Sequence, residues 1–358
     1  MATILAANTG NWSATGTWTG GVVPVAGDIV VANGKTVTID TLNVTVAEVR
    51  NDTTGGAVAG GTFNMVNGGS LTANVYLGST TACVTWAGLA GQTATITGQI
   101  FNNNFVAYAV NCSGGNLTIG AGSQVTGGNT NNICGGITFN STGTLIFGTA
   151  QSPGVITGGS GGVNNVGILC GASGSNITIY ASTITSNASG SGQGIQLGGS
   201  SQTVNIIATT INNSNAQGVA VYCNGASSNF TCSVSGNIQG GAGGNAMGIS
   251  IIQTGTYNVT VGGTILNGTG NGAAGVYHGN TLATVNVTGN VLASATGNGA
   301  NYAVYNQVTG TINVTGSITA GNSQIGGYNQ STGILRCTRA IGNGFGVGSV
   351  GTVSYTHL

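Results

Sequence analysis

The sequence predicts an all-β protein: a parallel β-helix (β-solenoid) of about ten three-strand coils, each of about 27 residues, behind an N-terminal β cap. We expect the coil to be right-handed. Three observations support this class: Val, Ile and Thr recur throughout a chain that is 40% hydrophobic, 69 of its 358 residues are Gly against 2 Pro, and a short motif returns at a nearly constant interval. β-branched residues favour strands and glycines supply tight corners, while the absence of a G-X-Y period excludes collagen.

The recurring motif is a strand that ends in Gly, one further residue, and then Ile or Val. It reads TITGQI at 95–100, SVSGNI at 233–238 and NVTGSI at 313–318. The final aliphatic residues form a column spaced by 23 to 31 residues: Ile100, Val125, Ile156, Ile184, Ile211, Ile238, Ile265, Val291, Ile318 and Ile341. The residues that open a preceding short strand form a second column: Gly167, Gly194, Gly218, Gly248, Gly275, Ala303 and Gly326. Two columns with one period predict stacked coils.

Each coil is expected to hold three short strands. In one coil these are residues 248–252, 257–261 and 263–268. Alternation along the middle strand sends Val259 and Val261 inward and Asn258 and Thr260 outward. Because stacked coils lie about 4.8 Å apart, we expect aliphatic ladders inside and hydrogen-bonded ladders of Asn, Thr and Ser outside.

Most of the predicted coils carry no charged residue. From Thr53 to Leu335 the chain has no Asp, Glu, Lys or Arg, and its formal net charge is zero. Stacked like charges would repel, so the architecture itself accounts for their absence. Glycosidases need two carboxylates and calcium needs several oxygen ligands, so we expect no catalytic site, metal or cofactor in the coils. The composition also gives no reason to expect a nucleic-acid partner, and no apolar stretch is long enough for a membrane helix.

The first 52 residues differ from the rest, and they hold all four acids: Asp28, Asp40, Glu48 and Asp52. We therefore divide the chain into an N-terminal cap at 1–52, a β-solenoid at 53–353 and an expected non-native tail at 354–358. An uncapped first coil would expose its core, and we expect Trp12 and Trp18 to cover it.

The same region suggests structural roles for its charged side chains. Asp28 and Asp40 are expected to cap turns on a solvated surface rather than to pair with Lys35 or Arg50.

Residues 11–40, NWSATGTWTGGVVPVAGDIVVANGKTVTID, resemble the start of G8-type domains and of related β-helix proteins of bacteria and phages. The resemblance implies an extracellular or particle-surface protein with a ligand-binding or adhesive role. The chain lacks the clustered Asp and basic residues of pectate-lyase-like β-helices and shows no recognisable secretion signal. Its last five residues, SYTHL, resemble the tail of metagenomic reading frames that run into translated sequencing adapter, which implies that the natural C-terminus is missing.

A few side chains invite functional hypotheses. His278, with Tyr277 and Asn280, resembles the base and its neighbours in some polysaccharide lyases, although no Arg or Lys lies nearby to stabilise an enolate-like charge. Cys112, Cys170 and Cys223 follow similar short strands, and we expect a buried, unreactive column.

The observations together predict a non-enzymatic, elongated structural or adhesive β-helix: a phage tail-fibre or virion surface protein, or a bacterial surface adhesin. It would lie on a virion surface or outside the cell and present polar ladders and loops at 150–165 and 239–247. Its partners would be host-surface glycans or other particle subunits, and it would be able to form a homo-oligomeric fibre. Two alternatives stay open. One is a lyase that uses His278 and Tyr277; the other is an ice-binding solenoid, against which the mixed outward residues and variable coil lengths count.

Overall fold

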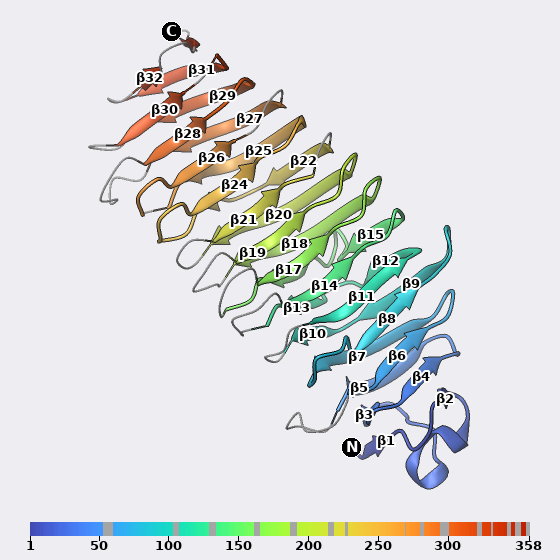
Figure 1. Cartoon of the computed structure of the whole chain (residues 1–358). Helices are drawn as coiled ribbons and strands as arrows, with labels where there is room; N and C mark the ends of the chain where they lie inside the picture. Colours follow the sequence, from blue (N-terminus) through green and yellow to red (C-terminus); the bar gives the residue numbers. More distant parts are fainter. Residues whose placement is uncertain are drawn as a thin grey trace.

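The computed structural model is an elongated β-solenoid with its termini at opposite ends (Figure 1). The structure describes residues 1–52, 60–102, 107–128, 134–160, 165–186, 192–213, 218–225, 228–268, 270–279, 283–293, 301–320, 324–330, 332–341, 345–347 and 352–355. The chain forms about 11 turns of about 27 residues, and its described helical segments are two short 3₁₀ turns, η1 (Thr15–Thr17) and η2 (Thr19–Gly21). The predicted fold class is confirmed.

The strands form two parallel sheets that face each other across the core. The 14-stranded sheet contains β2 (Gly10–Asn11), β4 (Thr36–Ile39), β6 (Thr62–Met65), β8 (Val84–Ala87), β11 (Tyr108–Gly114), β14 (Gly135–Phe139), β17 (Val166–Cys170), β19 (Gln193–Leu197), β21 (Val219–Cys223), β24 (Met247–Ile251), β26 (Ala274–His278), β28 (Tyr302–Asn306), β30 (Ile325–Asn329) and β32 (Phe345–Val347).

The 19-stranded sheet contains β1 (Thr3–Leu5), β3 (Ile29–Val31), β5 (Val44–Arg50), β7 (Ser70–Leu77), β9 (Thr93–Thr97), β10 (Gln99–Asn102), β12 (Asn116–Ile119), β13 (Gln124–Thr126), β15 (Thr144–Phe147), β16 (Gly154–Thr157), β18 (Asn176–Ser186), β20 (Thr203–Asn213), β22 (Ser228–Val234), β23 (Ile238–Gln239), β25 (Gly255–Leu266), β27 (Ala283–Leu292), β29 (Thr311–Thr319), β31 (Ile334–Ile341) and β33 (Thr352–Tyr355). In several later coils the second and third predicted strands join into one long strand. In β25 this strand bends where its pairing with β27 is interrupted, between Thr260 and Thr264.

The aliphatic column predicted from the sequence is a ladder of residues paired in register. It runs unbroken from Ile100 to Ile318 and extends toward the N-terminus through Val75, Val49 and Val30. Its predicted last member is wrong: Ile318 pairs with Ala340, while Ile341 pairs with Thr319 and is 36% exposed. This pairing results from a register shift in β29 after Val314, and no sequence motif predicts that shift.

The second predicted column also needs one correction. Ile195 pairs with Val221, so the residue beside Gly194 is Ala220 and not Gly218. Small residues are required here because the other sheet comes close. A Cβ added at Gly167 or Gly194 would lie 2.6 or 2.8 Å from the Cγ2 of an isoleucine in the facing ladder. Glycine and alanine therefore let the two sheets pack around the β-branched ladder.

The N-terminal end of the core is covered as predicted. Trp12 and Trp18 are 3% and 2% exposed, their rings meet edge to face at 5.0 Å, and Trp12 also contacts the ring of Phe63. Strands of the predicted cap pair in register with the following coils, as β4 does with β6 and β5 with β7, so the ladders are continuous across the predicted boundary at 52/53.

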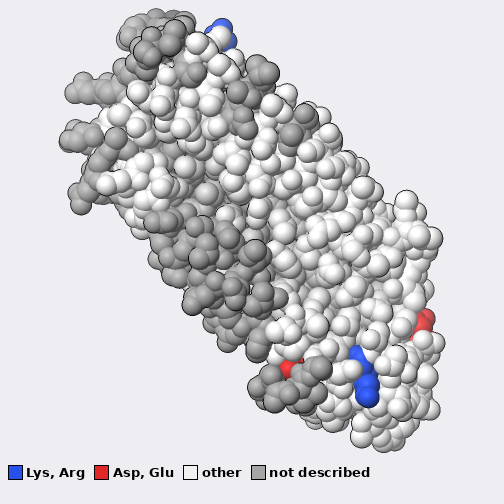
Figure 2. Space-filling view, in the orientation of Figure 1, with Lys and Arg blue, Asp and Glu red and all other residues white. Residues whose placement is uncertain are grey.

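The outer surface between the two ends is uncharged on the face shown in Figure 2. The segment 150–165, predicted as a projecting loop, contains β16, whose Ile156 is fully buried; residues 161–164 lie outside the described part. The segment 239–247 begins at the end of β23 and ends at the start of β24. In the predicted tail, residues 354 and 355 belong to β33, and 356–358 lie outside the described residues. Among the described residues, no helix has the length and hydropathy needed to cross a membrane.

Candidate ligand-binding groove

The outer face of the 19-stranded sheet carries a column in which large apolar residues give way to hydroxyls. Tyr180 pairs with Ile207, Ile207 with Ser233, and Ser233 with Thr260. Each of these residues alternates with buried neighbours along its strand, so all four side chains point away from the core. Ile207 is 39% exposed, which is unusual on a face where the other outward residues are mostly Asn, Thr and Ser.

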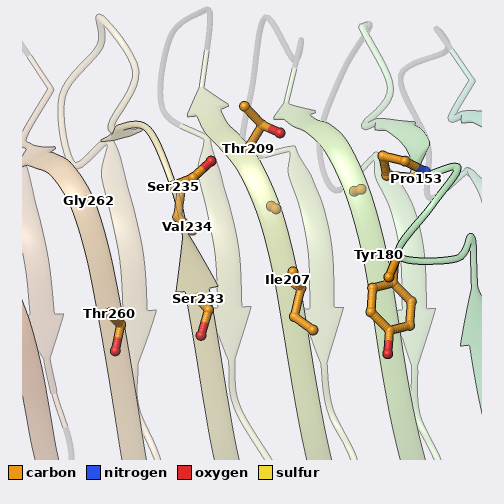
Figure 3. A pocket seen from close by; sticks show the side chains of 12 residues that line it. Pro153, Tyr180, Ile207, Thr209, Ser233, Val234, Ser235, Thr260 and Gly262 are labelled. Atoms are coloured by element: carbon orange, nitrogen blue, oxygen red, sulfur yellow. The ribbon is translucent and has the colours of Figure 1, made fainter.

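This column forms one side of a groove with a volume of about 450 Å³. The other side follows the bend of the strands, where Thr209, Ser235 and Gly262 are exposed. Ala150 and Pro153, which precede β16, also line the groove, and Pro153 lies near Tyr180 (Figure 3). The groove therefore crosses β18, β20, β22 and β25 along the solenoid axis.

The lining of the groove is chemically simple. It offers the ring of Tyr180, the aliphatic side chain of Ile207, several hydroxyl groups and no charged side chain. In the described part of the chain no aromatic ring packs against that of Tyr180, and the Tyr180 side chain is partly exposed. Apolar rings beside hydroxyls suit a sugar, which has C–H faces and hydroxyl edges.

Beyond the groove, the predicted polar ladders are present on three consecutive coils. Asn286 Nδ2 donates to Asn258 Oδ1 and Asn313 Nδ2 donates to Asn286 Oδ1, both at 2.9 Å. Thr315 Oγ1 donates to Thr288 Oγ1 at 3.3 Å. Over β25, β27 and β29 the outward residues follow one pattern, T-x-N-x-T, and pair in register. This face is more regular than the mixed composition of the whole chain predicted.

His278 and Tyr277 do not share a face. His278 is fully buried, and its Nδ1–H donates to Asn306 Oδ1 at 2.8 Å, while its Nε2 has no hydrogen-bond partner. Burial lowers the pKa of His278, which favours the neutral ring. The Tyr277 side chain points outward, where its hydroxyl donates to Gln307 Oε1. The structure thus does not bring together the two residues on which the lyase alternative depends.

Tyr277 instead belongs to a tyrosine cluster on the outer face of the 14-stranded sheet, with Tyr302, Tyr305 and Tyr328. Ring centroids lie 4.6 to 5.6 Å apart, and Tyr302 stacks on Tyr305 at an interplanar angle of 24°. The Tyr305 hydroxyl donates to Gln330 Oε1. Because the rings of these tyrosines pack against one another, less of their surface can contact a sugar, and this cluster is a weaker candidate for sugar stacking than Tyr180.

The cysteines behave as predicted. Cys112, Cys170 and Cys223 lie in one inward column, alternating with Phe139 and Leu197. All seven cysteines are buried, and burial raises the pKa of Cys112 to about 12, which disfavours the reactive thiolate.

The acids of the first 52 residues have structural partners, with one exception. Asp28 accepts hydrogen bonds from the backbone N–H groups of Ala2 and Val25, and Asp40 accepts from the N–H and hydroxyl of Ser13, as expected for turn capping. Glu48 pairs with Arg50. Asp52 is 2% exposed without a hydrogen-bond partner, and burial raises its pKa.

Within the described residues, no three His, Cys, Asp or Glu side chains gather in a way that could hold a metal ion. No family model, curated protein or solved structure matches the chain. The functional argument therefore depends on the chemistry of the surface.

The sequence interpretation did not single out Tyr180 and Ile207. The available signal was their place in the alternation: each is a large apolar residue at an outward position, next to a buried residue on either side. That they lie in adjacent coils became clear only from the register.

Proposed function

We propose that the chain is a non-enzymatic adhesive rod that binds glycans through the groove between Tyr180 and Thr260. The observation that carries the proposal is the groove lining, in which one free aromatic ring and one exposed Ile lie in line with a row of hydroxyls and no charge intervenes. Sugars are held by stacking of their C–H faces on aromatic rings together with hydrogen bonds to hydroxyls. The rigid solenoid fixes these groups in place, so little side-chain entropy is lost on binding.

We also propose where the protein is located: on the surface of a virion, as in a phage tail fibre, or on the surface of a bacterial cell. Support comes from the resemblance of residues 11–40 to the start of G8-type domains and from the rod shape, which suits display of a binding face at a distance. An uncharged surface also gives neighbouring rods little repulsion, which favours assembly into a fibre.

A glycan-array screen of the purified full chain tests this function. We expect selective binding, and Tyr180→Ala should weaken it by about tenfold, equivalent to about 1.4 kcal/mol. Tyr222→Ala is the matched control, because Tyr222 points outward from the 14-stranded sheet, away from the groove, and should leave binding unchanged. Equal loss in both variants, or no binding to any glycan, would contradict the proposal. Unsaturated sugar products, detected by ultraviolet absorbance in the same samples, would indicate a lyase instead.

Ice binding is a second candidate, favoured by one observation: the T-x-N-x-T array of β25, β27 and β29 repeats its hydroxyl and amide groups in register over three coils. A regular array of this kind can order water. The test is inhibition of ice recrystallisation, with Thr288→Tyr on the middle strand of the array and Thr85→Tyr on the other sheet as control. Inhibition that survives Thr288→Tyr would count against this array.

A further inference from the structure

We infer that the groove binds an unbranched, uncharged polysaccharide that lies along the solenoid axis, with one sugar ring for each coil. This inference rests on the proposed function and adds the ligand class and its direction. It begins from the repetition in the lining. The column from Tyr180 to Thr260 contributes one outward side chain per coil, each paired in register with the next.

The second wall of the groove has the same period. Ala208 pairs with Val234, and Val234 with Val261, so the residues that follow them, Thr209, Ser235 and Gly262, also lie one per coil. Figure 3 shows both rows running across adjacent strands. Coils repeat about every 4.8 Å. A pyranose chain linked through opposite sides of its rings advances by a similar length per ring, so successive rings would meet equivalent pairs of lining residues.

Charge selects among polysaccharides. No groove-lining residue is charged, and the chain has no Lys or Arg between Thr53 and Leu335 to pair with a carboxylate or sulfate. An anionic polymer would lose hydration in the groove without gaining an ion pair. The ligand that fits is therefore neutral.

An extended peptide fits less well. Peptides bind sheets mainly by adding a strand to an edge, where backbone groups are free. The groove crosses the face of the sheet, and β20 and β22 each pair with strands on both sides. A peptide there would also advance about 3.3 Å per residue, which does not match the coil repeat.

The groove has a direction. Tyr180 and Ile207 provide apolar surface at the end where Pro153 also lies, and Ser233 and Thr260 provide hydroxyls at the other end. The first ring would stack on Tyr180, and the next rings would bind increasingly through hydrogen bonds.

The test measures how the affinity depends on the number of sugar rings in the ligand. Affinities of the full chain are measured by calorimetry for cello-, manno- and chito-oligosaccharides of increasing length, with polygalacturonate oligomers as the anionic comparison. For at least one neutral series, affinity should rise severalfold with each ring until the ligand spans the coils of Tyr180, Ile207, Ser233 and Thr260, and then stay constant. The anionic oligomers should not bind.

Variants with a bulky side chain at one position of the column test which coils the ligand contacts. Thr260→Tyr should end the rise one ring earlier, and Ser233→Tyr two rings earlier. Two matched controls should leave the wild-type profile unchanged: Thr288→Tyr, one coil beyond the groove in the same column, and Thr231→Tyr, on the strand of Ser233 but in the neighbouring outward column. Circular dichroism checks that each variant is folded.

The outcomes separate the two proposals. If a neutral glycan binds and Tyr180→Ala weakens it, but affinity stops rising after one or two rings or ignores the blocking variants, the glycan-binding function stands and the axial arrangement is wrong. Tighter binding of the anionic series would overturn the neutral ligand class. If no glycan binds, both proposals fail.

Discussion

Two stretches of a single inward column on the 14-stranded sheet differ in chemistry while sharing the same backbone geometry. The apolar stretch runs from Trp86 to Ile251, with members Trp86, Cys112, Phe139, Cys170, Leu197, Cys223 and Ile251. The polar stretch continues the column with His278, Asn306 and Asn329. All three polar residues are fully buried.

The two stretches are stabilised in different ways. In the apolar stretch each side chain contributes by burial and packing, and its neighbours need no particular partner. In the polar stretch each residue depends on the next: His278 donates to Asn306 Oδ1, and Asn306 Nδ2 donates to Asn329 Oδ1 at 2.9 Å and to the Gly310 carbonyl at 3.2 Å. A solenoid can thus carry polar residues inside, provided that their hydrogen bonds continue from coil to coil.

The largest difference should appear when the middle of the polar stretch is removed. Asn306→Ala leaves the Nδ1–H of His278 and the Oδ1 of Asn329 buried without this partner, so we expect a loss of about 3 kcal/mol in the free energy of unfolding. Cys223→Ala, in the apolar stretch, should cost about 1 kcal/mol, because it removes one sulfur and leaves no polar group unpaired. Urea unfolding of the full chain, followed by circular dichroism, measures both. Equal losses would mean that the polar ladder is no more interdependent than the apolar one.

A smaller effect should distinguish the stretches by pH. The pKa of His278 is lowered below its usual 6.5 by burial, so below about pH 6.5 the unfolded chain takes up a proton that the folded chain does not. The stability that the neutral His278 ring contributes to the fold is therefore present at pH 7, and it is lost as the pH falls from about 6.5 toward the pKa of His278 in the folded chain.

The two residues that follow His278 in the column, Asn306 and Asn329, are both asparagines. Replacing His278 by Asn should therefore flatten this pH dependence of the stability. The measurement is the thermal midpoint between pH 7.5 and 5. Asp52 also titrates as the pH falls, but its raised pKa contributes in the opposite direction, so the variant must be compared with the wild type at each pH. An unchanged slope in His278→Asn would show that another group is responsible.

These comparisons also indicate how far the sequence could be used. Alternation and period predicted the solenoid, the aliphatic ladder and the buried cysteines, because each depends on which side of a strand a residue occupies. The inward position of His278 was accessible too, since it lies two residues after the buried Val276 in β26. Pairing across corners of variable length was not: the predicted positions of Gly218 and Ile341 were wrong for this reason. The groove was out of reach as well, because it requires the strand bend and the register of Tyr180 with Ile207.

The smallest expected effect concerns the apolar stretch. Its thiols are buried, and burial raises the pKa of Cys112 to about 12 and that of Cys170 further, so thiolate is scarce at pH 8. We expect no measurable reaction of the folded chain with a charged thiol reagent over minutes, and reaction of all seven cysteines in urea. Cys223→Val should change the free energy of unfolding by less than about 1.5 kcal/mol, since it exchanges one small buried side chain for another. Rapid labelling of the folded wild type would show instead that the apolar stretch opens readily, and the contrast with the polar stretch would then disappear.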